Sequence, residues 1–416
     1  MGKLLTADAP ETCTLEFDGA AIPALPGDTV SSALIAAGSL MTSRSAKYRR
    51  PRGPYCLLGD CGTCLVRVDG EPNVRACLTP VRDGMRVASQ NSYGELDPTA
   101  LIDSVFRGGI DHHHMVVYPR VANRMMQGFA RNLTGFGELP SSAPARPAAC
   151  VQDAPEVLVV GAGRAGAAAA EALRAAGVDV LLLDRRRGAR VFAAYPQEGV
   201  WAASEAVAGD AAPTLRLVRP RHVVLALGAH TPTIPVPGND VPGVVSARGL
   251  VDLLARSGRE LAASVVVIGE GAAAESLARA LAARLVAPAD ALRIAGRRRV
   301  KAVVTRSSGK LACELVALAP DPAPAYELAA QAGVEVRWTG AGFAPACDAA
   351  GRASLRAVDH PLGSREPPAP PPWTVWIAGE LRGDCGVDEA AASGRSVAAA
   401  ILREIRPVPE ASRVGA

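Results

Sequence analysis

Four cysteines gathered in a stretch of 22 residues are the side chains whose type and spacing point most directly to chemistry. They form the pattern C-x4-C-x2-C-x12-C and are Cys56, Cys61, Cys64 and Cys77. Two irons in one cluster need four thiolates that converge from one side, and a tight loop can present three of them together. The x4 and x2 spacing is that of plant-type two-iron loops, so the pattern predicts a [2Fe–2S] cluster.

The glycines of this loop support the same interpretation. Gly59 and Gly62 permit positive φ angles and let backbone N–H groups approach the sulfur atoms. A structural zinc site is the alternative, although zinc usually takes its ligands from separated C-x2-C pairs. Nine cysteines in 416 residues are too few for a disulfide scaffold.

A glycine-rich turn between a predicted strand and a predicted helix indicates a dinucleotide site. The strand Val157–Val160 leads into Gly161, Gly163 and Gly166, and a helix is expected over Ala167–Ala176. The first glycine makes the tight turn, the second lets the backbone meet a pyrophosphate, and the third allows close packing of helix on strand. The amino terminus of the helix then faces the phosphates.

The next predicted strand adds an acid to this site. It covers Val178–Leu183 and ends at Asp184, 23 residues after Gly161. A carboxylate at this place can accept hydrogen bonds from the ribose hydroxyls of an adenosine. The alternative is a strand–helix–strand unit kept for packing alone.

A second strand–loop–helix unit follows later in the chain. Its loop is G-x-G-x-x-A with Gly269 and Gly271, and its second strand is predicted over Ala291–Ala295. That strand leads into Arg297 and Arg298 rather than into an acid. Arginines at this place can pair with the 2′-phosphate of an NADP-type dinucleotide. A vestigial nucleotide domain with arginines on a solvated edge is an equal alternative.

The predicted elements that position these residues change in character along the chain. The first 90 or so residues show short strands and turns with one helix over Thr29–Ala37. From Glu156 onward, apolar strands that end in glycines alternate with Ala-rich helical stretches, which is typical of a doubly wound α/β layer. A last strand, Thr374–Ala378, and a last helix, Asp388–Glu404, complete this layer.

Composition excludes several classes of function. The net charge is +4 and the chain has 16 aromatic residues, so neither a nucleic-acid surface nor an anionic membrane surface is indicated. No run of 18 apolar residues predicts a transmembrane segment, and the first residues lack the apolar core of a secretory signal. We therefore expect a cytoplasmic protein.

The cysteine-containing segment resembles a known family. The likeness is carried by Phe17-Asp-Gly, Pro26-Gly-Asp-Thr, Arg50-Pro-Arg-Gly, Pro72-Asn-Val-Arg-Ala-Cys and Gly84-Met-Arg-Val. These stretches resemble the ferredoxin-type module of bacterial amine dehydrogenases and oxidases, which include sarcosine oxidase alpha chains, hydrogen cyanide synthase, and opine or hydroxyproline dehydrogenase subunits. The resemblance implies an α+β, β-grasp ferredoxin-like domain that holds a [2Fe–2S] cluster.

The remainder resembles two-dinucleotide flavoproteins of the pyridine nucleotide-disulfide oxidoreductase type, with an α/β Rossmann-like core. Val223–Ala229, which contains Gly228, is similar to their return motif, and Trp376–Gly386 is similar to their final flavin motif. The resemblance implies FAD at the first site, with Gly379, Glu380 and Gly386 near the ribityl chain. The chain after Asp184 already matches a later part of the family pattern, so a segment that contributes to the FAD pocket is absent.

We therefore expect four parts: a ferredoxin-like domain over 11–95, a connector over 96–154, an FAD-binding domain over 155–262 and 340–405, and an inserted NAD(P)-type domain over 263–339. The resemblance implies an electron-transferring oxidoreductase subunit acting on a secondary amine or amino acid. No residue here presents itself as an amine-binding acid or base, so we expect a beta-type flavoprotein partner to carry that site. The alternatives are an NAD(P)H-dependent ferredoxin-type reductase and a non-catalytic assembly subunit with an empty FAD site.

Overall fold

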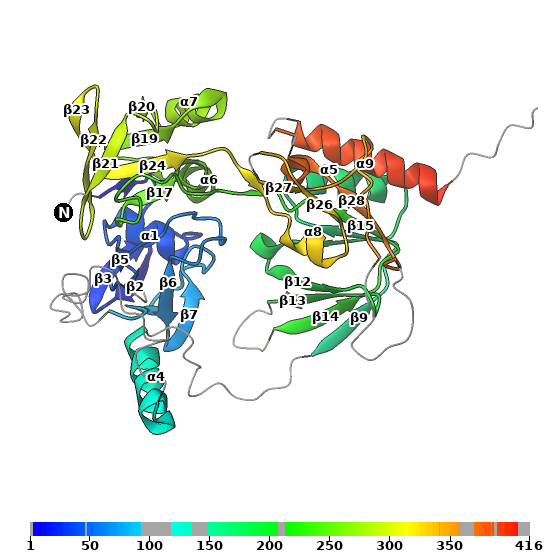
Figure 1. Ribbon diagram of the computed structural model, residues 1–416, viewed down its shortest axis with the longest axis horizontal. Coiled ribbons are helices and arrows are strands. Elements are labelled where there is room, and N and C mark those ends of the chain that lie inside the picture. Colours follow the sequence, from blue (N-terminus) through cyan, green and yellow to red (C-terminus); the bar gives the residue numbers. More distant parts are fainter. Residues whose placement is uncertain are drawn as a thin grey trace, which may run out of the picture. The chain divides into compact units, whose positions relative to one another are not determined.

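The chain forms two compact units in a computed structural model. The model describes residues 3–45, 48–92, 118–134, 149–206, 213–340, 342–357, 370–383, 385–386 and 389–406. Unit 1 combines 1–143 with 231–321, and unit 2 combines 144–230 with 322–416 (Figure 1). No helix in the described part of the chain is long and apolar enough to cross a membrane.

The first part of unit 1 is a mixed sheet that packs on a short helix. The strands, in sheet order β3-β2-β8-β6-β7, are β3 (Ala20–Ala24), β2 (Cys13–Phe17), β8 (Arg86–Ser89), β6 (Leu65–Val68) and β7 (Glu71–Arg75). β2 runs parallel to β8, and the other pairs are antiparallel. Helix α1 (Val30–Ala36) begins at Thr29, whose side chain and that of Ser32 form a reciprocal capping box. This arrangement is the expected β-grasp ferredoxin-like domain.

The second part of unit 1 is a parallel sheet covered on both faces. Its strands, in sheet order, are β17 (Val244–Ser246), β24 (Leu315–Ala319), β19 (Val265–Gly269) and β20 (Arg284–Val286). Helices α6 (Ala247–Ser257) and α7 (Gly271–Ala280) pack on one face. The other face is covered by the antiparallel strands β21 (Ala291–Gly296), β22 (Val300–Thr305) and β23 (Gly309–Ala312).

The two parts of unit 1 share one hydrophobic core. Leu5 and Ile35 from the ferredoxin-like part pack in the same buried cluster as Leu250 and Val267 from the later part. Strand β1 (Leu5–Thr6) also pairs with β18 (Glu260–Leu261). The later part is therefore built into the ferredoxin-like domain rather than attached to it only by a connector.

The packing of the described residues groups the chain differently from the four parts expected from the sequence. Residues 231–262 lie in unit 1 and 322–339 lie in unit 2, whereas the expected boundaries put 231–262 in the FAD-binding domain and 322–339 in the insert. The reason lies in where apolar surface is buried. β17 and α6 complete the layers of unit 1, whereas Ala329 and Val334, on and beside α8 (Glu327–Gln331), pack in the core of unit 2.

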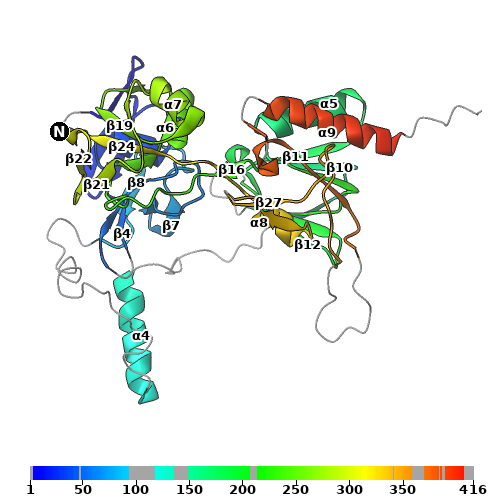
Figure 2. The same ribbon diagram turned by 45° about the horizontal axis from the view of Figure 1, so that its top comes forward.

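The sheet of unit 2 is parallel throughout. Its strands, in sheet order, are β11 (Val180–Leu183), β10 (Val157–Val160), β15 (His222–Leu225) and β28 (Thr374–Ile377). Along β10, Val157 and Val159 face helices α5 (Arg164–Ala175) and α9 (Ala390–Ile405), which lie side by side in Figure 2. Leu158 and Val160 face the opposite core. Because both faces are covered, every residue of the strand is apolar.

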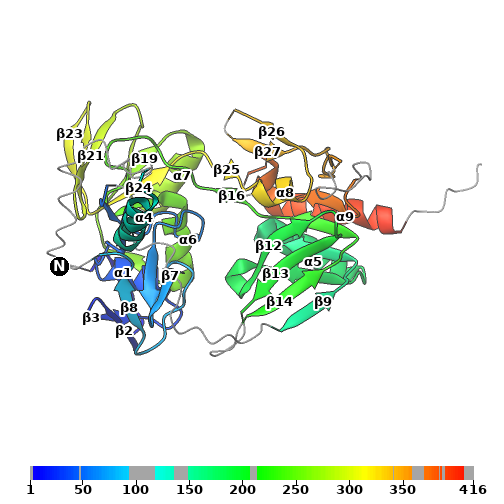
Figure 3. The ribbon, with the colours of Figure 1, turned by 60° about the horizontal axis from the view of Figure 1, so that its bottom comes forward.

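A second sheet covers that opposite face. Its strands, in sheet order, are β12 (Ala189–Tyr195), β13 (Val200–Glu205), β14 (Thr214–Val218) and β9 (Cys150–Asp153) (Figure 3). The chain passes from β11 through the short 3-10 helix η2 (Arg185–Arg187) directly into β12. Smaller elements are β4 (Ser43–Arg44), β5 (Pro51–Arg52), β16 (Ala229–His230), β25 (Ala323–Pro324), β26 (Val336–Trp338), β27 (Phe343–Pro345) and η3 (Gly379–Arg382).

The expected connector over 96–154 falls largely outside the described residues. Within it the structure describes 118–134 and 149–154. The first of these contains helix α4 (Arg120–Thr134), and the second contributes β9 to unit 2.

Candidate iron–sulfur and flavin sites

The four sequence-predicted thiols meet in unit 1. Cys56 and Cys61 lie on the loop between β5 and β6, Cys64 immediately precedes β6, and Cys77 follows β7. Cys56, Cys64 and Cys77 are 1–2% exposed, whereas Cys61 is exposed. The ferredoxin-like core holds Cys64 and Cys77 directly, because both side chains belong to its buried cluster.

The loop directs backbone donors at Cys56. The N–H groups of Leu58, Asp60 and Cys61 donate to the Cys56 sulfur over 3.4, 3.2 and 3.4 Å. Gly59 supports this fold with a φ of +87°, a conformation that glycine adopts without strain. The thiols of Cys61 and Cys77, followed by the loop N–H groups, hold the pKa of the Cys56 thiol well below its usual range. The loop is therefore built to stabilise negative charge on sulfur.

The contacts among the thiols fit a two-iron cluster. Cys56 contacts Cys61 and Cys77 through its side chain, and Cys77 in turn contacts Cys64. Across the described ranges, no three His, Cys, Asp or Glu side chains surround one point as the ligands of a single metal ion. The four thiols instead form a continuous chain of contacts, Cys61 to Cys56 to Cys77 to Cys64, so all four are close enough together to serve a two-iron cluster.

The predicted dinucleotide residues meet at one edge of the parallel sheet in unit 2. Val160, Leu183, Leu225 and Ile377 are in register across the four strands. The residues that follow them are therefore neighbours at the carboxyl ends of the strands, where open α/β sheets bind ligands. These residues include Gly161, Asp184, Gly228, Gly379 and Glu380.

The three glycines of the first loop have different surroundings. A Cβ on Gly161 would lie 2.3 Å from the Ala226 oxygen, and one on Gly166 would lie 1.8 Å from the Gly161 oxygen. At Gly163 a Cβ would meet nothing within 4 Å. Gly163 is also the N-cap of α5 and no side chain caps this helix. Helix α5 thus begins without a side-chain cap, beside open space at Gly163 that suits a pyrophosphate.

The acids of this edge have different partners. Asp184 accepts hydrogen bonds from the N–H groups of Ala162 at 2.7 Å and Arg186 at 2.8 Å, so it ties the glycine loop to η2. Glu380 lies across the edge, and its Oε2 is 3.9 Å from the position of a Cβ on Gly228. Gly379, with a φ of +69°, packs against the α5 residue Ala165. The N–H of Gly386 lies 3.4 Å from a Glu389 oxygen, on the segment that leads to α9.

A histidine–carboxylate pair beside this edge was not predicted from the sequence. The Nε2 of His230 lies 3.0 Å from Oε2 of Glu327, and the N–H of Ala325 donates to the Gly228 oxygen. Strands β16 and β25 pair with each other and bring the two side chains together. A separation of 97 positions gives no local signal, so sequence spacing could not reveal the pair.

The second glycine loop keeps its expected strand and helix but not its expected arginines. The strand that runs beside β19 is β20, not Ala291–Ala295. Arg297 and Arg298 lie in the turn between the antiparallel strands β21 and β22. The prediction that these arginines stand at the nucleotide edge beside Gly269 and Gly271 is therefore wrong.

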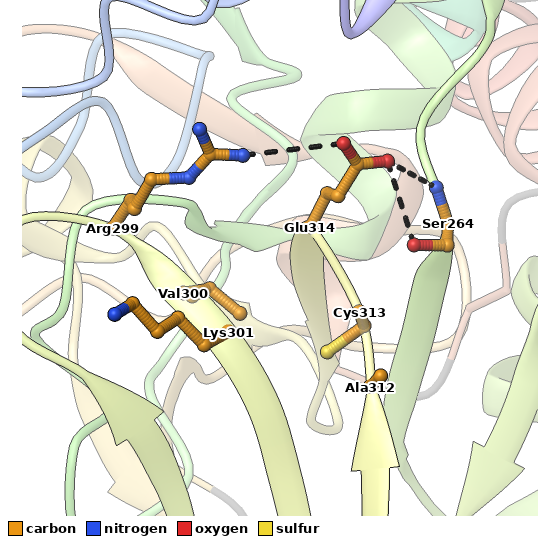
Figure 4. Close-up of a pocket in the computed structure, with 7 residues that line it drawn as sticks. All are labelled: Ser264, Arg299, Val300, Lys301, Ala312, Cys313 and Glu314. Atoms are coloured by element: carbon orange, nitrogen blue, oxygen red, sulfur yellow. Dashed lines mark hydrogen bonds and ion pairs between the residues drawn. The ribbon is translucent and has the colours of Figure 1, made fainter. Parts of the chain in front are cut away.

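The place of that turn gives the physical reason. Arg299 lies 3.9 Å from Glu314, whose Oε2 accepts a hydrogen bond from the N–H of Ser264 (Figure 4). Ser264 and Glu314 precede β19 and β24, so the turn lies at the amino ends of these strands. A dinucleotide on Gly269–Gly271 binds at the carboxyl ends, on the opposite edge.

Comparisons with known proteins agree with both cofactor sites. Residues 11–92 match the 2Fe-2S iron-sulfur cluster binding domain, and residues 154–193 match an FAD binding domain. The crystal structure of L-proline dehydrogenase from P. horikoshii has the same fold, with a TM-score of 0.67 and 17% identity over 97% of this chain and 76% of that one.

Two curated relatives define the family. Sarcosine oxidase subunit alpha of Rhizobium meliloti is 34% identical over 179 residues, which cover 40% of this chain but only 18% of that protein. Hydrogen cyanide synthase subunit HcnA of Pseudomonas aeruginosa is 38% identical over 79 residues, which cover 19% of this chain and 75% of that subunit. The chain therefore belongs to the family of HcnA and sarcosine oxidase alpha subunits, and it combines a 2Fe-2S cluster binding domain with an FAD binding domain.

Proposed function

We propose that this chain is the electron-transfer subunit of a complex that oxidises a secondary amine or amino acid. The observation that carries the proposal is that one chain combines a four-thiol loop with an FAD-type glycine loop, in a family whose named members act on sarcosine or belong to a synthase complex. A flavin accepts two electrons together and a two-iron cluster passes them on singly. The pair of cofactors therefore suits the step between a two-electron donor and a one-electron acceptor.

The residues of each site have distinct tasks in this proposal. Gly163 leaves room for the FAD pyrophosphate, and Gly161 and Gly166 allow the tight turn and the close packing of α5 that bring the loop there. Asp184 would hold the adenosine ribose. Glu380 lies where the flavin end of the cofactor is expected. The four cysteines hold the cluster, and the exposed Cys61 leaves one side open to an electron partner. The amine site itself is assigned to a partner flavoprotein subunit.

An NAD(P)H-dependent reductase is the competing function, and the position of the arginine turn argues against it. Without Arg297 and Arg298, the carboxyl edge of the inserted sheet lacks the cations proposed for a 2′-phosphate. Glu270 also lies within the G-x-G segment as the N-cap of α7, where its carboxylate repels a pyrophosphate.

Anaerobic reduction of the complex tests the proposal. The chain is purified with its co-purifying subunits, its FAD is quantified, and sarcosine, L-proline and related secondary amines are added one at a time. We expect at least one amine to bleach the flavin and to produce the EPR signal of a reduced two-iron cluster, and we expect no such signal from the isolated chain. Rapid cluster reduction by NADPH in the isolated chain would establish the reductase instead. Absence of FAD from a complex with an intact cluster would establish an assembly role.

A further inference from the structure

The loop that carries the first cluster ligand rests on the first turn of α6. The N–H of Ser246 donates to the backbone carbonyl oxygen of Tyr55 over 2.8 Å. The Ser246 hydroxyl in turn accepts a hydrogen bond from the N–H of Gly249 at 3.1 Å and so caps the helix. A Cβ on Gly249 would lie 2.0 Å from the Cys56 oxygen and 3.2 Å from the Leu57 Cβ. The helix thus approaches the Cys56 peptide so closely that only glycine fits.

Further contacts fix the same stretch of loop to the inserted part of unit 1. The Tyr55 hydroxyl donates to the Pro232 oxygen over 2.5 Å, and Arg52 forms an ion pair with Asp240. Leu57 is 2% exposed in the core that contains α6 and α7. The stretch 52–57 is therefore held by the inserted part at Arg52, at Tyr55 and at Leu57.

Three of the four ligands are consequently held by two different parts of the chain. Cys64 and Cys77 are fixed by the ferredoxin-like core. The backbone of Cys56 is fixed by α6, and the Cys56 sulfur receives the three N–H groups of its loop. A shift of α6 against the ferredoxin-like sheet therefore moves Cys56 relative to Cys64 and Cys77.

We propose that the first turn of α6, through Ser246 and Gly249, is a positioning element that sets the reduction potential of the cluster. Reduction adds negative charge to the sulfur atoms, and N–H groups directed at sulfur together with the positive end of a helix stabilise this charge. Displacing the Cys56 peptide from α6 weakens both effects, so it favours the oxidised cluster. This inference rests on the cluster and is independent of the identity of the electron donor.

A Gly249→Ala substitution in the full chain tests the inference. The matched control is Gly128→Ala, because Gly128 also lies within a helix but a Cβ there meets nothing within 4 Å. We expect Gly249→Ala to lower the ratio of reduced to oxidised cluster, at a fixed solution potential, about two- to fivefold. This range is the typical effect of a helix end on a nearby charge. Gly128→Ala should leave it unchanged. The readout is a redox titration followed by EPR, which also reports the geometry around the irons.

A second variant keeps the inference testable if Gly249→Ala does not fold. Tyr55→Phe keeps the ring but removes the hydroxyl and with it the hydrogen bonds to Pro232 and Thr233, so we expect a smaller shift in the same direction. Far-ultraviolet circular dichroism and iron content establish that each variant is folded and loaded. A folded Gly249→Ala protein with wild-type potential and EPR spectrum would overturn the inference. An unfolded Gly249→Ala protein together with an unshifted Tyr55→Phe protein would do the same.

Discussion

The ion pair between Arg259 and Asp28 is the buried polar contact that joins the ferredoxin-like part of unit 1 to its inserted part. Both side chains are 0% exposed, and Nη2 of Arg259 lies 2.6 Å from Oδ2 of Asp28. Nη1 of Arg259 also lies 3.2 Å from Glu11. Burial opposes the charge on Arg259, but the hydrogen bond and the attraction of Asp28 outweigh it and raise the arginine pKa. Replacing Arg259 by methionine keeps much of the volume and leaves the Asp28 carboxylate without its cation.

The expected loss follows from the partners that Asp28 retains. Removing one member of a buried ion pair costs about 3–5 kcal/mol. Asp28 still accepts hydrogen bonds from the Leu25 N–H at 2.8 Å and from the Ser32 hydroxyl at 2.7 Å, so the low end of this range applies. We therefore expect Arg259→Met to reduce the free energy of unfolding of unit 1 by about 3 kcal/mol, a little more than a hundredfold in the equilibrium constant.

Urea unfolding with two reporters measures this loss. The visible absorption of the cluster follows unit 1, and flavin fluorescence follows unit 2. We expect Arg259→Met to lower the urea midpoint of the cluster signal and to leave the flavin signal unchanged. Arg216→Met in unit 2 is the matched control, because Arg216 also binds two acids but is 22% exposed, which limits each pair to about 0–1 kcal/mol. A loss below about 1 kcal/mol for Arg259→Met would refute the reasoning.

Three further predictions concern the cofactor sites and the pH dependence of unit 2. Cys61→Ser should abolish the two-iron EPR signal, whereas Cys150→Ser, which also replaces an exposed cysteine, should leave it intact. Gly163→Ala should fold normally but bind FAD about tenfold more weakly in a fluorescence titration, whereas Gly166→Ala should lower the thermal midpoint of the protein itself. Burial lowers the pKa of His222, so the unfolded chain takes up a proton at a higher pH than the folded chain does. The thermal midpoint of unit 2 should therefore fall as the pH drops through about 6.5, and His222→Gln should flatten this slope.

Local patterns predicted the loops and strands that carry the cofactor sites. The strand Val157–Val160 is found with its predicted bounds, since its continuous apolar residues mark it clearly. The prediction failed at Arg284–Val286, a strand of three residues that is too short to show periodicity. The longer stretch Ala291–Ala295 fits a strand pattern better, so the sequence predicts a strand there instead. This prediction puts the arginines that follow it at the wrong edge of the sheet.

The packing of the insert on the ferredoxin-like domain could not be predicted, because it depends on contacts between residues far apart in the chain and not on a local pattern. Asp28 and Arg259 are 231 positions apart, and nothing in the sequence around either residue distinguishes it from a charged residue on the surface. Their burial depends on which apolar faces meet, and two-residue strands such as β1 and β18 leave no periodic trace.

The consequence for function is specific. Ser246 lies at the carboxyl end of β17, on the edge where an open α/β sheet normally binds a ligand. At this end of β17, Ser246 and Gly249 contact the loop that carries Cys56, so the inserted sheet holds the iron–sulfur loop of its own chain. We conclude that a nucleotide-binding architecture supplies, at this position, the support of a metal centre.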